Sequence, residues 1–238
     1  MKDLARNMRL RLRNSRHTGS LIFLLLLLIY FLILDFHHIL LLPPRGIHFI
    51  RQTDSLAFVM TYLRNGFDFF EPGVYNLQST EGKAASEFPL LYYFTALLYA
   101  VFGEHPALLR GLNLLILSAG LFYLFRLLNR LLDDTVFALL FTFLFMSSTV
   151  LLYYGNNFLP DAPALGFALM GWYWFHSYWQ VRGSIKQLAL AFLFFSLAAL
   201  LRITFFLHPL AALLAVFGSG LHARQPIGYL MRKHLKLL

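Results

Sequence analysis

The sequence has no cysteine and very little charge. Without cysteine, the 238-residue chain has no disulfide, no thiolate nucleophile and no cysteine-ligated metal. Only 13% of the residues are charged, whereas about a quarter are charged in an ordinary soluble domain. Hydrophobic residues make up 59% of the chain, and its mean hydropathy is +0.64. The apolar runs are too extensive to be buried in one soluble domain, so the composition predicts an integral membrane protein.

Acidic side chains are also scarce, with 11 Asp and Glu against 20 Lys and Arg. The basic residues flank apolar runs, which is typical of topology signals and of attraction to anionic membrane lipid. We therefore predict no nucleic-acid partner. The first 17 residues are strongly basic and precede the apolar run Leu21–Leu34. No small-x-small cleavage site follows, and Ile39–Leu42 continues the apolar stretch, so we predict an uncleaved signal anchor with a cytoplasmic N-terminus.

Six apolar segments are candidate spanning helices, since a span needs about 20 mostly apolar residues. The fold class predicted is therefore all-α, a multi-pass protein with about six transmembrane helices. The last two segments are short and nearly continuous around Arg202, and they form either two short helices or one bent helix. The segments are Leu21–Leu42, Leu108–Leu128, Thr135–Tyr154, Ala162–Trp179, Leu188–Leu201 and Thr204–Phe217.

A seventh apolar stretch, Pro89–Phe102, decides which side of the membrane later loops face. As a helix on the outer surface it leaves most lysines and arginines inside, whereas as a span it leaves fewer than half there. The positive-inside rule and the short length favour the surface helix. We thus predict one membrane domain over residues 1–238. Its parts are a first span at 19–42, an external loop with juxtamembrane helices at 43–106, further spans at 107–218 and a basic cytoplasmic tail at 219–238.

Three carboxylates on the predicted outer side each stand at an expected helix start: Asp54, Glu87 and Asp161. After Asp54, apolar residues recur at helical spacing until Asn65-Gly66, which predicts a short amphipathic helix with Asp54 as its N-cap. Each carboxylate alone is explained as a helix-terminal charge. Together they could bind a divalent metal cation or supply a general base.

Basic side chains accompany these carboxylates. Arg202 interrupts apolar sequence, where an ionisable residue is either functional or snorkels to the headgroups. Arg51 and Lys83 could bind phosphate or be solvated surface charges. His37 and His38 near the end of the first span are adjacent and do not share a helix face, so we expect them to be interfacial and a poor metal site.

In this order, the residues resemble the N-terminal half of the lipid-linked-sugar glycosyltransferases with the GT-C fold, in particular bacterial relatives of protein O-mannosyltransferases and the aminoarabinose transferase of lipid A. The resemblance runs from Leu21 to about Phe217. After the first span it rests on five features in a fixed order. They are an acidic motif with an amphipathic helix (Arg51–Gly66), a Glu-x-Pro segment leading into an apolar helix (Glu87–Gly103), a basic residue at the start of the next span (Arg110), a Pro-Asp motif (Pro160-Asp161) and a basic residue after the fifth span (Arg202).

The resemblance implies a multi-pass protein of a bacterial-type inner membrane. It also implies a hexosyl- or pentosyltransferase that moves a sugar, with inversion, from a polyprenyl-phosphate donor to an acceptor on the external face. It implies that Asp54 is the catalytic base and that Glu87 and Asp161 line the same cavity, near a divalent metal in some relatives and without one in others. The sequence departs from the family twice. Ser55 stands where relatives have a second carboxylate, and Phe88 stands where the aminoarabinose transferase has lysine.

The relatives are about twice as long, so we expect the chain to be the N-terminal part of a longer enzyme. Two alternatives to an active enzyme are kept. The first is a truncated, non-catalytic membrane protein of the same fold. A lipid or sugar transporter is less favoured, because the polar residues gather at one face instead of midway across the membrane.

Overall fold

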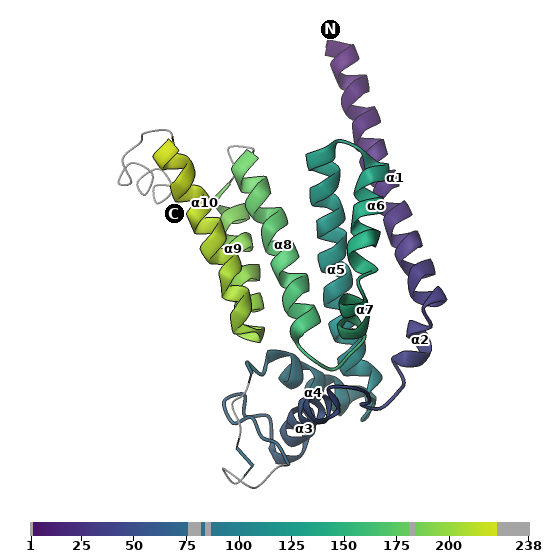
Figure 1. Ribbon diagram of the computed structural model, residues 1–238, viewed down its shortest axis with the longest axis vertical. Coiled ribbons are helices and arrows are strands. Elements are labelled where there is room, and N and C mark those ends of the chain that lie inside the picture. Colours follow the sequence, from purple (N-terminus) through teal and green to yellow (C-terminus); the bar gives the residue numbers. More distant parts are fainter. Residues whose placement is uncertain (1, 76–81, 84–86, 181–183, 223–238) are drawn as a thin grey trace.

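The computed structural model describes residues 2–75, 82–83, 87–180 and 184–222, and this part of the chain is helical with a single isolated bridge between Gly73 and Lys83 (Figure 1). The prediction of an all-α fold is confirmed. The elements are α1 (Lys2–Ile33), α2 (Phe36–Ile39), α3 (Phe49–Asn65), α4 (Leu90–Phe102), α5 (Ala107–Leu132), α6 (Thr135–Met146), α7 (Thr149–Gly155), α8 (Asp161–Gln180), α9 (Ile185–Leu201), the 3₁₀ turn η1 (Ile203–Phe206) and α10 (Leu207–His222).

The helices form an upright bundle with a crossed layer at one end. In Figure 1, α1, α5, α6, α8, α9 and α10 run along the long axis, whereas α3 and α4 lie across the end opposite the chain's N-terminus. Within the bundle α5 packs on α6 and α8, and α8 packs on α9. We call the end that carries α3 and α4 the crossed end.

Each of the six predicted spans coincides with a helix or with two consecutive helical segments. By length and hydropathy, α5 is the one described helix that could cross a membrane alone, and α6 with α7 forms a second candidate that is bent by 75°. The other apolar helices are shorter, so the number of spans stays a prediction. They are His17–Ile33, Leu90–Phe102, Ile185–Leu201 and Ile203–Ala215.

The structure resolves the alternative left open around Arg202. Helix α9 ends at Leu201, Arg202 has an extended backbone with φ −146° and ψ 113°, and η1 then starts α10. The two last apolar segments are therefore separate helices that pack on each other, and Arg202 lies in the break between them.

Helix α4 has the dimensions and packing of a surface helix. Its 13 residues extend about 20 Å, well short of the roughly 30 Å of a hydrocarbon core. Buried residues recur along one face, at Leu91, Tyr92, Thr95, Ala96 and Tyr99. Of these, Tyr92, Ala96 and Tyr99 pack on α3, whereas Leu91 packs on α8 and α9. Helix α3 ends at Asn65 before Gly66 with φ 97°, as the Asn-Gly signal predicted. The location of α4 outside the hydrocarbon remains a prediction.

Two glycines let α5 and α8 cross in backbone contact. A Cβ placed on Gly120 would lie 2.6 Å from the Gly166 carbonyl oxygen, and one placed on Gly166 would lie 2.6 Å from the Ile116 oxygen. Small residues at such crossings permit the close approach that stabilises helices in lipid. The crossing fixes α8 on α5 and thereby positions Asp161, the first residue of α8. Most of the predicted basic tail, from residue 223 onward, lies outside the described residues.

Candidate active site

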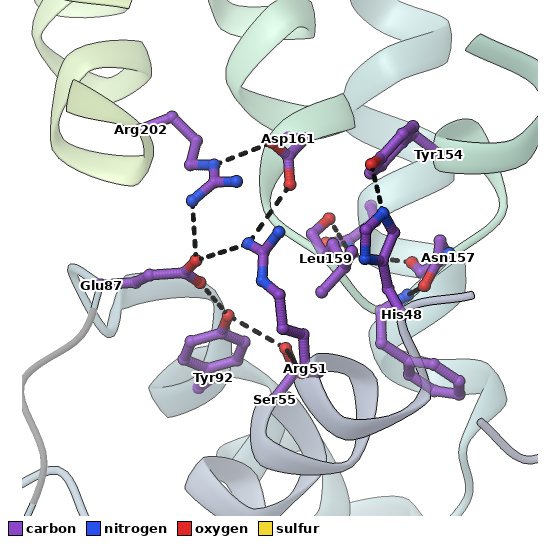
Figure 2. Close-up of polar contacts among 12 residues, drawn as sticks. His48, Arg51, Ser55, Glu87, Tyr92, Tyr154, Asn157, Leu159, Asp161 and Arg202 are labelled. Carbon is purple, nitrogen blue, oxygen red and sulfur yellow. Dashed lines mark hydrogen bonds and ion pairs between the residues drawn. The ribbon is translucent and has the colours of Figure 1, made fainter. Parts of the chain in front are cut away.

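Four charged side chains from distant parts of the sequence meet between the crossed layer and the upright helices (Figure 2). Arg51 lies in the first turn of α3, and Glu87 precedes α4. Asp161 begins α8, and Arg202 occupies the break after α9. The bundle therefore brings Glu87 and Asp161 to one place with Arg51 and Arg202.

The two arginines join the two carboxylates into a closed ring of ion pairs. Arg202 donates from Nε to Asp161 at 2.8 Å and from Nη1 to Glu87 at 3.2 Å. The Nη2 atom of Arg51 lies 3.2 Å from Glu87 Oε1 and 3.8 Å from Asp161 Oδ2. Arg202 uses two nitrogens of its planar guanidinium, which fixes its orientation, whereas Arg51 reaches both carboxylates through Nη2.

A buried tyrosine completes the coordination of Glu87. The Tyr92 hydroxyl donates to Glu87 Oε2 at 2.6 Å and lies 3.2 Å from the Ser55 hydroxyl. Burial raises the pKa of the Tyr92 phenol well above its usual range, and the Glu87 carboxylate raises it further. Tyr92 therefore stays protonated at neutral pH and remains a hydrogen-bond donor to Glu87.

Asp54 lines a pocket of about 320 Å³ together with Arg51, Ser55, Glu87 and Arg202. Among the described residues, no cationic side chain and no hydrogen-bond donor pairs with the Asp54 carboxylate, whereas Glu87 and Asp161 are neutralised by arginine. The three carboxylates thus differ in their contacts within the described residues. Glu87 and Asp161 are ion-paired with arginine, whereas Asp54 lines the pocket without an ion-pair partner.

The interpretation of Asp54 as a helix cap is wrong. Helix α3 begins at Phe49 with His48 at its N-cap, so Asp54 lies in the second turn, where backbone N–H groups already have partners within the helix. A capping role therefore does not account for Asp54.

The carboxylates do not suit the divalent cation considered from sequence. Over the described residues, no three acidic or histidine ligand atoms at this place lie within 4.8 Å of one another. Two guanidinium groups stand between Glu87 and Asp161 and already supply the positive charge that a cation would bring. We therefore derive no catalytic step through a metal here.

Lys83 lies apart from the site, contrary to the expectation that it lines the cavity. Its ammonium lies 3.5 Å from Glu71 and is 70% exposed, and it does not line the pocket. Of the two basic residues considered for phosphate contacts, Arg51 lines the pocket and Lys83 does not; Arg202 also lines it.

A second, apolar cavity adjoins the polar pocket. It has a volume of about 510 Å³, and Glu87 and Arg202 form part of its wall as well as of the polar pocket's. Aromatic and aliphatic side chains make up most of the remainder. They include Phe69, Phe70, Phe88, Leu200 and Ile203. Phe88, the position at which the sequence departs from the aminoarabinose transferase, is thus part of an apolar wall.

Sequence reasoning missed two kinds of contributor. Tyr92 was overlooked as part of an apolar helix, although a phenol in such a stretch needs a polar partner when it is buried. The loop before α8 is held by Asn113, which donates to the Asn157 carbonyl at 3.0 Å and to the Leu159 carbonyl at 3.2 Å. These contacts fix the backbone just before Asp161.

Residues 85–235, more than half of the chain, match the dolichyl-phosphate-mannose-protein mannosyltransferase family. The chain belongs to this family. The match includes Glu87, Asp161 and Arg202, and it begins after Arg51 and Asp54. Neither a curated protein nor a solved structure matches the chain.

Membership establishes the general class of the protein. It is a membrane glycosyltransferase of the GT-C type, as the sequence resemblance indicated. Family proteins are integral membrane proteins that use lipid-linked sugar donors, which agrees with the apolar helices of the bundle. In this member of the mannosyltransferase family, the candidate active site is the group of paired arginines and carboxylates at the crossed end.

Proposed function

We propose that the protein transfers a sugar, with inversion, from a polyprenyl-phosphate donor to an acceptor hydroxyl on the external face of the membrane. The observation that carries the proposal is the Asp54 carboxylate, which has no ion-pair partner in the described part of the chain and lines a polar pocket. The Arg202–Glu87 wall of this pocket is shared with an apolar cavity. A prenyl-phosphate sugar has the matching parts, an apolar chain joined through phosphate to a polar sugar.

The crossed end supports an external location for the reaction. The site lies at the end of the bundle opposite the basic N-terminus of α1 (Figure 1). Because a basic N-terminus favours the cytoplasm, the opposite end faces outside.

In the proposed step Asp54 is the general base. The acceptor oxygen attacks the anomeric carbon as the bond from that carbon to the phosphate oxygen breaks. The bonding electron pair leaves with the prenyl phosphate, and the acceptor proton passes to Asp54. Negative charge thus moves from Asp54 to the departing phosphate, and attack opposite the leaving group inverts the anomeric centre.

Arg51 and Arg202 are placed to stabilise that charge. Each guanidinium has five N–H donors, and the contacts with Glu87 and Asp161 occupy a minority of them. Because the carboxylates hold both arginines in position before the reaction, the remaining donors need little reorganisation as charge develops. The family's characteristic motif residues Glu87 and Asp161 act here as positioning groups.

One carboxylate oxygen of Asp161 is available for a substrate contact. Its Oδ2 atom is buried and, within the described residues, accepts no hydrogen bond, with Arg51 at 3.8 Å as an ion-pair partner. A buried acceptor without a donor is unfavourable, so a sugar hydroxyl that donates there would be bound selectively.

The proposal is tested with Asp54→Asn in the full chain, purified in detergent. Donor binding and sugar release are measured separately, first with polyprenyl-phosphate mannose and then with a panel of other polyprenyl-phosphate sugars. Loss of a general base typically slows a reaction by about 10²–10⁴-fold, so transfer should fall by that factor while donor affinity changes little.

Glu104→Gln is the matched control, since Glu104 is an exposed carboxylate after α4 and does not line the pocket. It should leave both measurements unchanged. Transfer by Asp54→Asn at the parent rate would show that Asp54 is not the base.

A further inference from the structure

A turn at the end of α1 brings together an aspartate and two histidines that lie outside the candidate active site. Asp35 Oδ1 lies 2.6 Å from His38 Nδ1 and 3.5 Å from His37 Nε2. One ligand atom from each residue lies within 4.8 Å of the other two, and the two imidazole ring centres are 4.2 Å apart. The sequence predicts a poor metal site here, because adjacent residues on a continuous helix do not share a face.

The backbone explains why that reasoning does not apply. Asp35 has φ 59° in the left-handed region, which breaks the helix between α1 and the four-residue α2. Aspartate tolerates this conformation better than most residues do. The break turns the chain so that the Asp35 carboxylate reaches both rings, whereas in an uninterrupted helix it would face His38 at i+3 but not His37 at i+2.

The turn is anchored on both sides of the histidine pair. Phe36 is buried and stacks on Phe31 at 5.0 Å, and its carbonyl accepts a hydrogen bond from Asn156 at 3.3 Å. On the other side, the buried Arg110 guanidinium donates to the Ile39 carbonyl. Because Phe36 and Ile39 are held against the bundle, the backbone of His37 and His38 is fixed while their side chains remain exposed.

We propose that Asp35, His37 and His38 bind a transition-metal dication of the Zn²⁺ class. Imidazole nitrogen and carboxylate oxygen are ligands that Zn²⁺ accepts, and three protein ligands with water in the fourth position make an open zinc site. The oxygen-preferring Mg²⁺ and Ca²⁺ are poorly matched to two imidazoles.

The charge and mobility of the three side chains fit this ligand set. Over the described residues, the ion-pair partners of Asp35 are these two histidines, so its charge is not committed to an arginine as those of Glu87 and Asp161 are. Bonds of about 2.0–2.1 Å to a tetrahedral zinc place ligand atoms about 3.4 Å apart. The rings are 51% and 68% exposed, so they can rotate to that spacing without disturbing packed neighbours.

The proposed metal site lies at the crossed end with the candidate active site, since α2 follows the end of α1 that is remote from the N-terminus (Figure 1). Metal dications dissolved on that side of the membrane would reach it directly. The site does not depend on the proposed transferase activity.

Calorimetric titration of the metal-free full chain with Zn²⁺ tests the proposal, with a tag that contains no histidine. The parent should bind one Zn²⁺ at this site, and the double variant His37→Ala/His38→Ala should lose that binding or weaken it by at least tenfold. Asp35→Asn should also weaken it, because Asn tolerates the left-handed backbone but lacks the charge. Titration with Mg²⁺ should show no binding that depends on these residues.

His105→Ala is the matched control, since His105 is an exposed histidine that forms no part of the cluster. It should bind Zn²⁺ like the parent. Because the rings of His37 and His38 are exposed, the double variant should elute and unfold like the parent, which size-exclusion and thermal unfolding check. His105→Ala loses the hydrogen bond from the Ala107 N–H, so its unfolding is measured alongside. The proposal is overturned if the parent does not bind Zn²⁺ at up to millimolar concentration. It is equally overturned if the double variant retains the parent affinity, or if binding is lost in Asp54→Asn instead.

Discussion

Substitution of Gly120 by alanine should separate helices α5 and α8. The added Cβ would lie 2.6 Å from the Gly166 carbonyl oxygen and close to the Gly166 Cα, and backbone atoms cannot rotate away as a side chain can. Ordinary contact begins at 3.4 Å, so the contact with the carbonyl oxygen alone requires the two helices to move apart by about 0.8 Å, and the closer Gly166 Cα requires more. Such overpacking typically costs about 1–3 kcal/mol.

Gly111→Ala on the same helix is the matched control, because a Cβ there meets nothing within 4 Å. Alanine is favoured over glycine in a helix by about 0.8–1.0 kcal/mol, so this variant should be as stable as the parent or slightly more so. The two alanine variants should therefore differ by about 1–3 kcal/mol in the free energy of unfolding, once their equal gains in helix propensity cancel.

Unfolding in detergent, followed by circular dichroism during titration with a denaturant, measures the difference. Sugar transfer should fall as well in Gly120→Ala, because a shift of α8 carries Asp161 away from Arg202 and weakens a 2.8 Å hydrogen bond. If Gly120→Ala is as stable and as active as Gly111→Ala, the two helices do not cross in backbone contact and the reasoning is refuted.

Three further changes test the site and the topology. Arg202→Lys keeps the charge but lacks the fork that contacts two carboxylates, so donor affinity should fall about tenfold or more, whereas Lys83→Ala should leave it unchanged; equal effects would contradict the assignment. Tyr92→Phe removes the hydrogen bond to Glu87, so the free energy of unfolding should fall by about 1–3 kcal/mol and sugar transfer should slow. Denaturant unfolding and a transfer assay on the same preparation measure both effects. Single cysteines in place of Lys83 and Glu104 should both react with an impermeant maleimide added outside, and reaction of the first alone would mean that α4 crosses the membrane.

The sequence determined the features that depend on local composition. Apolar segments of sufficient length predicted helices at the observed places, and the Asn65-Gly66 pair predicted the end of α3. The motifs around Glu87, Asp161 and Arg202 indicated the family that the match over residues 85–235 shows. These signals are readable because hydropathy, helix periodicity and stop residues act over a few turns of chain.

The tertiary structure alone decided how the charges are paired. Nothing in the spacing of the sequence indicates that Arg202 bridges Glu87 and Asp161 while Asp54 pairs with no described residue. Those contacts depend on helix packing, including the place where α5 and α8 cross. The meeting of Asp35 with two adjacent histidines likewise follows from one left-handed residue and two buried anchors. Hydropathy and spacing describe which face of a helix is apolar, but the distance between side chains more than 100 positions apart is set by helix packing.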